Sequence, residues 1–151
     1  MQKIIPNLWF KGNAAEAVDF YLSVFPDGKI ISTSTYPTEG LLDFQKDFAG
    51  KVLTITFEIF GQKFLAINAG PEFSFTEAIS FCILCKDQEE IDYYWDKLTK
   101  EGEESQCGWL KDKFGMSWQV NPHNMEELSQ NPQVFKNILG MKKIIIANLE
   151  K

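Results

Sequence analysis

An internal repeat is the feature of this sequence that most constrains its fold. In each half, a short apolar stretch is followed by a residue that can start a helix, with a glutamate three residues later. The pairs are Asn13 with Glu16 and Asp87 with Glu90, and they are 74 residues apart. A pattern that occurs twice at a fixed spacing predicts two similar structural modules in one chain.

The first half predicts the order strand, helix and three strands. The apolar stretch 4–10 is short and typical of a buried strand, and apolar residues recur at helical spacing from Ala14 to Phe25. Further strands are expected at 29–36, 52–60 and 63–68, with a polar loop before the second of them.

The second half repeats this order. Strands are expected at 78–85 and 116–121, with a short segment at 105–110 before the second, and a helix begins after Asp87. The spacing is shorter than in the first half, which indicates that a loop has been lost. After Pro122 the pattern changes to two short helices and an apolar tail, Ile144–Ile146. We expect this tail to pack on the domain or on a second subunit, because three adjacent isoleucines are unfavourable in water. Because each half combines strands with a helix, the predicted fold class is α+β.

Composition excludes several functions. The chain has 15 basic residues, all lysine, against 21 acidic residues, and its net charge of -6 disfavours nucleic acid as a partner. It has one histidine, His123, and an odd number of cysteines, three. No apolar run reaches the ~18 residues of a membrane span, and no signal peptide is evident, so we expect a cytoplasmic protein without a membrane partner.

Several motifs carry a family resemblance that covers nearly the whole chain. They are 8–17 (LWFKGNAAEA), 68–73 (NAGPEF), 77–81 (EAISF), 87–95 (DQEEIDYYW) and 107–120 (CGWLKDKFGMSWQV). Together they resemble the PhnB-like branch of the vicinal oxygen chelate superfamily, which includes glyoxalase I, bleomycin resistance proteins and extradiol dioxygenases.

The resemblance implies a single glyoxalase-like domain over residues 1–151. Two βαβββ modules, at about 1–72 and 73–122, would place curved mixed sheets around a cleft, followed by C-terminal helices and a tail at 123–151. The superfamily's cleft holds a divalent metal on side chains from the first and last strands of each module. In this sequence those positions are Ser80 and Gln119 in the second module, and in the first Pro6 and either Leu65 or Ile67.

This set lacks the usual histidine and glutamate ligands, so no metal or other cofactor is expected, and Gln119 is the one candidate ligand if a metal binds. Strand alternation places Leu8 and Phe10 on the face equivalent to that of Ser80 and Cys82. These residues are predicted to contact a ligand in the cleft, although a role in the core is the alternative.

Aromatic residues at turns and strand ends add candidates. Trp109 and Trp118 are predicted to bind the ligand together with Gln119, although aromatics also serve as core. Glu77 and Gln119 are the candidate catalytic residues. Cys82 and Cys85 should point to opposite faces of their strand, which disfavours a redox pair.

Two functions follow as hypotheses. In the first, the protein binds a small apolar or aromatic molecule without a catalytic metal, as bleomycin resistance proteins sequester a drug. In the alternative, it is a divalent-metal-dependent lyase or dioxygenase, so whether it is an enzyme stays open. The apolar tail and the superfamily's habit of completing sites between subunits predict a homodimer.

Overall fold

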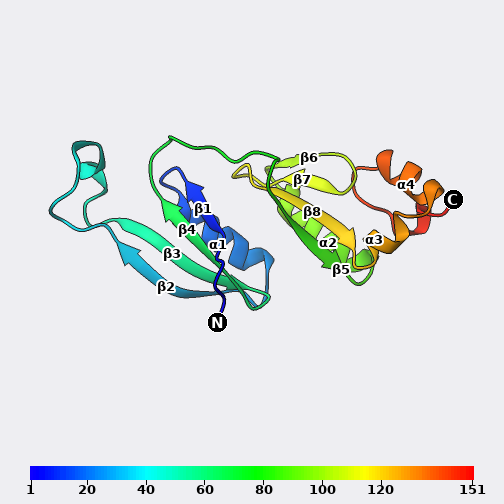
Figure 1. Cartoon of the computed structure of the whole chain (residues 1–151), viewed down its shortest axis with the longest axis horizontal. Helices are drawn as coiled ribbons and strands as arrows, with labels where there is room; N and C mark the ends of the chain where they lie inside the picture. Colours follow the sequence, from blue (N-terminus) through cyan, green and yellow to red (C-terminus); the bar gives the residue numbers. More distant parts are fainter. The chain divides into compact units, whose positions relative to one another are not determined.

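Each repeat of the sequence forms its own four-stranded mixed sheet with one helix packed on it (Figure 1). The computed structural model describes all 151 residues, which divide into two compact units, Met1–Ser74 and Phe75–Lys151. The sequence places the end of the first module at about residue 72, close to this division. The predicted α+β class and the two βαβββ modules are confirmed.

The first unit has the strand order β1-β4-β3-β2. The outer strand β1 is parallel to β4, and the other neighbours are antiparallel. A 3₁₀ helix, η1 (Asp43–Phe48), lies in the loop that the sequence predicts as irregular. The remaining elements are β1 (Asn7–Phe10), α1 (Ala14–Val24), β2 (Lys29–Thr35), β3 (Val52–Ile59) and β4 (Gln62–Asn68).

The second unit repeats this topology with the order β5-β8-β7-β6, in which β5 is parallel to β8. Its sheet is built from β5 (Ser80–Cys85), β6 (Glu103–Glu104), β7 (Trp109–Lys111) and β8 (Ser117–Pro122), with α2 (Gln88–Thr99) packed on it. Three short helices follow: α3 (Met125–Leu128), α4 (Pro132–Leu139) and η2 (Ile146–Asn148).

One face of each sheet is covered by its helix. On α1 the side chains of Ala14, Val18 and Tyr21 are buried, and Tyr21 stacks on Phe57 of β3 with ring centroids 6.1 Å apart. On α2 the buried side chains are those of Ile91, Tyr94, Trp95 and Leu98. Burial of these apolar faces is the main stabilising contribution within each unit.

The two helices begin differently. The Asp87 side chain accepts a hydrogen bond from the Glu90 N–H at 2.9 Å, as the sequence predicts. Asn13 is the N-cap residue of α1, as the sequence predicts, but its side chain makes no capping hydrogen bond, because its oxygen accepts from the Lys11 N–H instead. The Asn68 side chain accepts from the Ala14 N–H at 3.2 Å, so the end of β4 supplies the missing cap.

The C-terminal tail packs on its own unit. Ile144 is fully buried in a cluster with Val134, Ile138 and Leu149. Of the two alternatives open for this tail, the structure shows packing within the chain. None of the helices combines the length and apolar character that crossing a membrane requires.

A buried carboxylate holds the turn between β7 and β8. Asp112 is 2% exposed, and its Oδ1 accepts from the N–H groups of Phe114 and Met116 at 2.9 and 3.1 Å. Its Oδ2 accepts from Trp118 Nε1 at 2.9 Å. Both carboxylate oxygens are thus used within the turn, so Asp112 stabilises the turn and is not free to bind a ligand.

Asp112→Ala is expected to lower the free energy of unfolding by about 3 kcal/mol, because three donors, two of them buried, lose their acceptor. Urea unfolding followed by circular dichroism measures this change. Asp96→Ala, which removes an exposed carboxylate from α2 of the same unit, is the matched control and should change stability by less than about 0.5 kcal/mol. Equal effects of the two substitutions would contradict the structural role of Asp112.

Candidate functional site

The open face of each sheet, opposite its helix, is the candidate functional surface, and strand register decides which residues lie on it. Phe10 and Cys85 are the last residues of β1 and β5, and both are buried under a helix. Two residues separate Phe10 from Asn13, but only Lys86 separates Cys85 from Asp87. The extra residue is accommodated at Gly12, whose φ of 84° is in the left-handed region.

The prediction that Leu8 and Phe10 share a face with Ser80 and Cys82 is therefore wrong. A shift of one residue turns every side chain of a strand to the opposite face. Leu8 and Phe10 are 5% and 2% exposed in the core under α1. The positions on the open face of β1 are those of Asn7 and Trp9.

Trp118 is also on the covered face. It is buried, and its indole N–H donates to Asp112. Trp118 and Gln119 are consecutive in β8, so their side chains point to opposite faces. The sequence assigns both to one ligand site, and the structure separates them.

The other candidates come together on the open face of the second sheet. Gln119 pairs with Cys82 on one side and with Trp109 on the other. The Gln119 Nε2 donates to Ser80 Oγ at 2.9 Å. Ser80, Cys82, Trp109 and Gln119 thus form one patch, which we call the Gln119 patch.

Two further residues of β8, missed by the sequence analysis, belong to this patch. Asn121 Nδ2 donates to Cys82 Sγ at 3.4 Å and to Gln119 Oε1 at 3.5 Å. Asn121 Oδ1 and Ser117 Oγ are buried without a hydrogen-bond partner. Ser117, Gln119 and Asn121 occupy every second position of β8. This spacing of polar residues is the sequence signal that could have placed Ser117 and Asn121 on the same face as Gln119.

An ion pair lies at the edge of the patch. Glu77 binds Lys111 of β7, and this hydrogen bond lowers the pKa of the Glu77 carboxyl and raises the pKa of the Lys111 ammonium. A small cavity of about 150 Å³ is lined by both residues together with Trp109 and Ser117. A carboxylate with a lowered pKa is a weaker base, which disfavours Glu77 as a general base.

The residues at the superfamily's metal positions do not fit a catalytic divalent metal. Ser80 and Gln119 are in contact, but they offer neutral oxygens, and the Gln119 amide nitrogen faces the Ser80 hydroxyl. In the first unit Leu65 pairs with Asn7 in the same way that Gln119 pairs with Cys82 in the second. The position equivalent to Gln119 is therefore occupied by an apolar residue, Leu65. The chain has no group of three or more His, Cys, Asp or Glu side chains arranged to hold a metal.

Comparison with known proteins agrees with the resemblance seen in the sequence. The family described as 3-demethylubiquinone-9 3-methyltransferase matches residues 2–121. A PhnB protein from Bacillus cereus is 37% identical, with a TM-score of 0.67 over 79% of this chain and 98% of that chain. No curated protein matches the chain.

Two more distant structures share the fold. Protein PA1353 from Pseudomonas aeruginosa is 19% identical, with a TM-score of 0.65 over 81% of this chain and 98% of its own. The fosfomycin resistance protein FosX from Listeria monocytogenes, solved with Mn(II) and sulfate, is 15% identical, with a TM-score of 0.54 over 87% of this chain and 99% of that chain. At these identities the likeness concerns the fold alone.

The cysteines of β5 test the assignment of faces. Cys82 is exposed on the open face and Cys85 is buried under α2, which confirms that the two thiols point apart. Burial raises the pKa of both thiols, and that of Cys85 to about 12. Because the thiolate is the reactive form, Cys85 should be almost inert near neutral pH.

Iodoacetamide at pH 8 is expected to alkylate Cys82 at least a hundredfold faster than Cys85, as followed by peptide mass spectrometry. Raising the pH from 8 to 9 should accelerate the reaction of Cys82, because a raised thiol pKa leaves most of the thiol protonated at pH 8. A Cys82→Ser variant is the control for peptide assignment. Equal labelling of both cysteines in folded protein would contradict the assigned faces.

Proposed function

The chain belongs to the PhnB-like family described as 3-demethylubiquinone-9 3-methyltransferase, which has the vicinal oxygen chelate fold, and from this premise we propose that it binds a small aromatic or apolar molecule on the Gln119 patch without a catalytic metal. The observation that carries the proposal is the placement of Trp109 beside Gln119, where neutral polar groups stand at the superfamily's metal positions.

Methyl transfer is not supported by the residues of this chain. No two of its 10 glycines are two residues apart, so it lacks the G-x-G element of glycine-rich nucleotide and S-adenosylmethionine loops. The family description therefore does not define the activity proposed for this protein.

The chemistry of the patch defines the class of ligand. The half-buried indole of Trp109 can stack on a planar ring, and the amides of Gln119 and Asn121 can each donate and accept hydrogen bonds. The side chains of Ser80, Gln119 and Asn121 are uncharged, and the charges of Glu77 and Lys111 at the edge of the patch are paired with each other. An uncharged ring with one or two polar substituents matches this combination better than an anion does.

Binding is expected to be independent of metal. Protein purified without chelator should retain far less than one equivalent of manganese, iron, nickel or zinc after add-back and desalting, as measured by elemental analysis. The uncharged aromatic probes indole and 1-naphthol should bind equally with and without EDTA in calorimetric titrations. Trp109→Ala should weaken their binding about tenfold, because the stacking surface is lost.

Phe135→Ala is the matched control for this titration, because it removes an exposed aromatic ring from α4 of the same unit. It should leave probe binding unchanged. Absence of binding by both probes, or equal losses in the two variants, would contradict the proposal.

A divalent-metal-dependent lyase or dioxygenase is the second candidate function. Its one candidate ligand is Gln119, at a position that holds metal in the superfamily, although the Gln119 amide nitrogen faces Ser80 here. About one equivalent of a single metal per chain, lost in Gln119→Ala, would support this enzyme and overturn metal-free binding.

We also propose that the protein is a cytoplasmic homodimer. Its three cysteines are free, which suits a reducing compartment. The open face of the first sheet carries the half-buried Trp9, Leu65 and Ile67, and such a face is more stable when another sheet covers it.

Sedimentation velocity at 10 μM is expected to give a species of twice 17.3 kDa. Ile67→Lys should shift it toward the monomer, because a charge would be buried at the contact. The matched substitution Leu84→Lys changes an exposed residue on the open face of the other sheet and shows whether that face is also covered. A monomeric wild-type protein would contradict the dimer.

A further inference from the structure

A second cavity lies in the second unit, away from the Gln119 patch. Its volume is about 440 Å³, within the range of small-molecule sites, roughly 300–1,000 Å³. One wall comes from the loops after β5 and β8, and the other comes from the C-terminal segment 146–150. Pro122, Leu128, Ile146 and Leu149 give it an apolar lining.

The ends of two parallel strands bring two basic side chains to the rim of this cavity. Cys85 and Pro122 are paired in register, and the His123 N–H donates to the Cys85 carbonyl at 2.8 Å. Lys86 and His123 therefore lie next to each other, each directly after the last residue of its strand, and both are exposed. The carboxyl ends of parallel strands are a common place for ligand sites in sheets.

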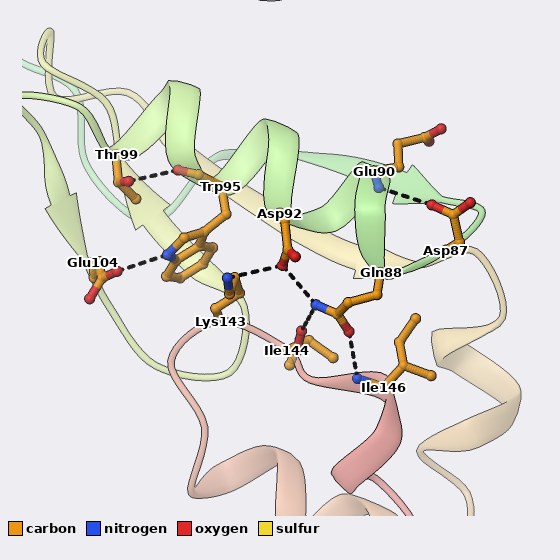
Figure 2. A network of polar contacts seen from close by, with 10 residues as sticks. All are labelled: Asp87, Gln88, Glu90, Asp92, Trp95, Thr99, Glu104, Lys143, Ile144 and Ile146. Atoms are coloured by element: carbon orange, nitrogen blue, oxygen red, sulfur yellow. Dashed lines mark hydrogen bonds and ion pairs between the residues drawn. The ribbon is translucent and has the colours of Figure 1, made fainter.

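The wall opposite these residues is held in place by specific contacts (Figure 2). The side-chain amide of Gln88 in α2 donates to the Ile144 carbonyl at 3.0 Å and accepts from the Ile146 N–H at 2.8 Å. Asp92 accepts from Gln88 at 2.9 Å and forms an ion pair with Lys143 at 2.9 Å. The backbone of the segment is thus fixed on both sides of Ile144.

The segment beyond residue 121 lies outside the part of the chain that matches the family. It contributes Leu128, Ile146 and Leu149 to the cavity, and the family-matched part contributes Lys86. The second unit therefore forms this cavity by combining its repeated module with the C-terminal segment. It is also separate from the Gln119 patch, because no residue lines both.

We propose that this cavity binds a small organic monocarboxylate, whose carboxylate contacts Lys86 and His123 and whose apolar body lies against Leu128, Ile146 and Leu149. Lysine and histidine are the only cationic side chains this chain has for an anion, since it contains no arginine. Glu150 lines the cavity on the C-terminal side and would repel a second negative charge, so a monoanion is favoured over a dianion.

The test uses three probes of similar shape, benzoate, benzamide and phthalate, in calorimetric titrations of the full chain. Benzoate should bind at least tenfold more tightly than either benzamide or phthalate. Lys86→Ala and His123→Ala should each weaken benzoate binding about tenfold, as expected for loss of a charge-assisted hydrogen bond. Glu150→Gln should strengthen it about threefold.

Two control variants show whether benzoate binds in this cavity or elsewhere on the chain. Lys100→Ala removes an exposed lysine at the end of α2, and it should leave benzoate binding unchanged. Trp109→Ala should also leave it unchanged, because Trp109 belongs to the Gln119 patch. Absence of benzoate binding at millimolar concentration, equal binding of benzamide, weaker binding in Glu150→Gln or loss of binding in Trp109→Ala would each overturn the proposal.

Discussion

The parallel pairing of the first and last strands in each unit is the constraint on which the rest of the structure depends. Parallel strands cannot be joined by a tight turn, so the chain must cross over, and in both units the first part of that crossover is the helix. The helix covers one face of the sheet with apolar side chains and leaves the other face open. The distinction between core and candidate site therefore follows directly from this pairing.

The sequence predicts this architecture well because its signals are local and occur twice. The Asp87 cap and the apolar face of α2 both depend on residues within a few positions of one another. The face of β1 could not be predicted in the same way. It depends on the extra residue before Asn13. The spacing of 74 residues compares the starts of the two helices, so it does not detect a residue inserted between a strand and its helix.

The candidate site shows the same limit. Ser80 and Gln119 are 39 residues apart, and strand register alone brings them together. Asn121 lies in a predicted strand and is 7% exposed, but only the pairing of β8 with β5 places its side chain on the face of Gln119. The sequence does predict that the patch is uncharged. An approximate alignment with the superfamily is enough to show that Ser80 and Gln119 stand at its metal positions. Side-chain contacts such as Asn121 with Cys82 require the folded backbone.

The C-terminal segment shows how a repeated module acquires a site of its own. The first unit ends soon after β4, and the carboxyl ends of β1 and β4 are linked through the Asn68 cap of α1. In the second unit the chain continues past β8, and Gln88, one residue after the helix cap, binds the returning backbone at Ile144 and Ile146. A side-chain amide can replace a neighbouring strand here because its N–H donors and its carbonyl acceptor lie in the same plane. The extra chain is thus held against the ends of β5 and β8, where its apolar wall and two basic side chains line a cavity that the repeated module alone could not build.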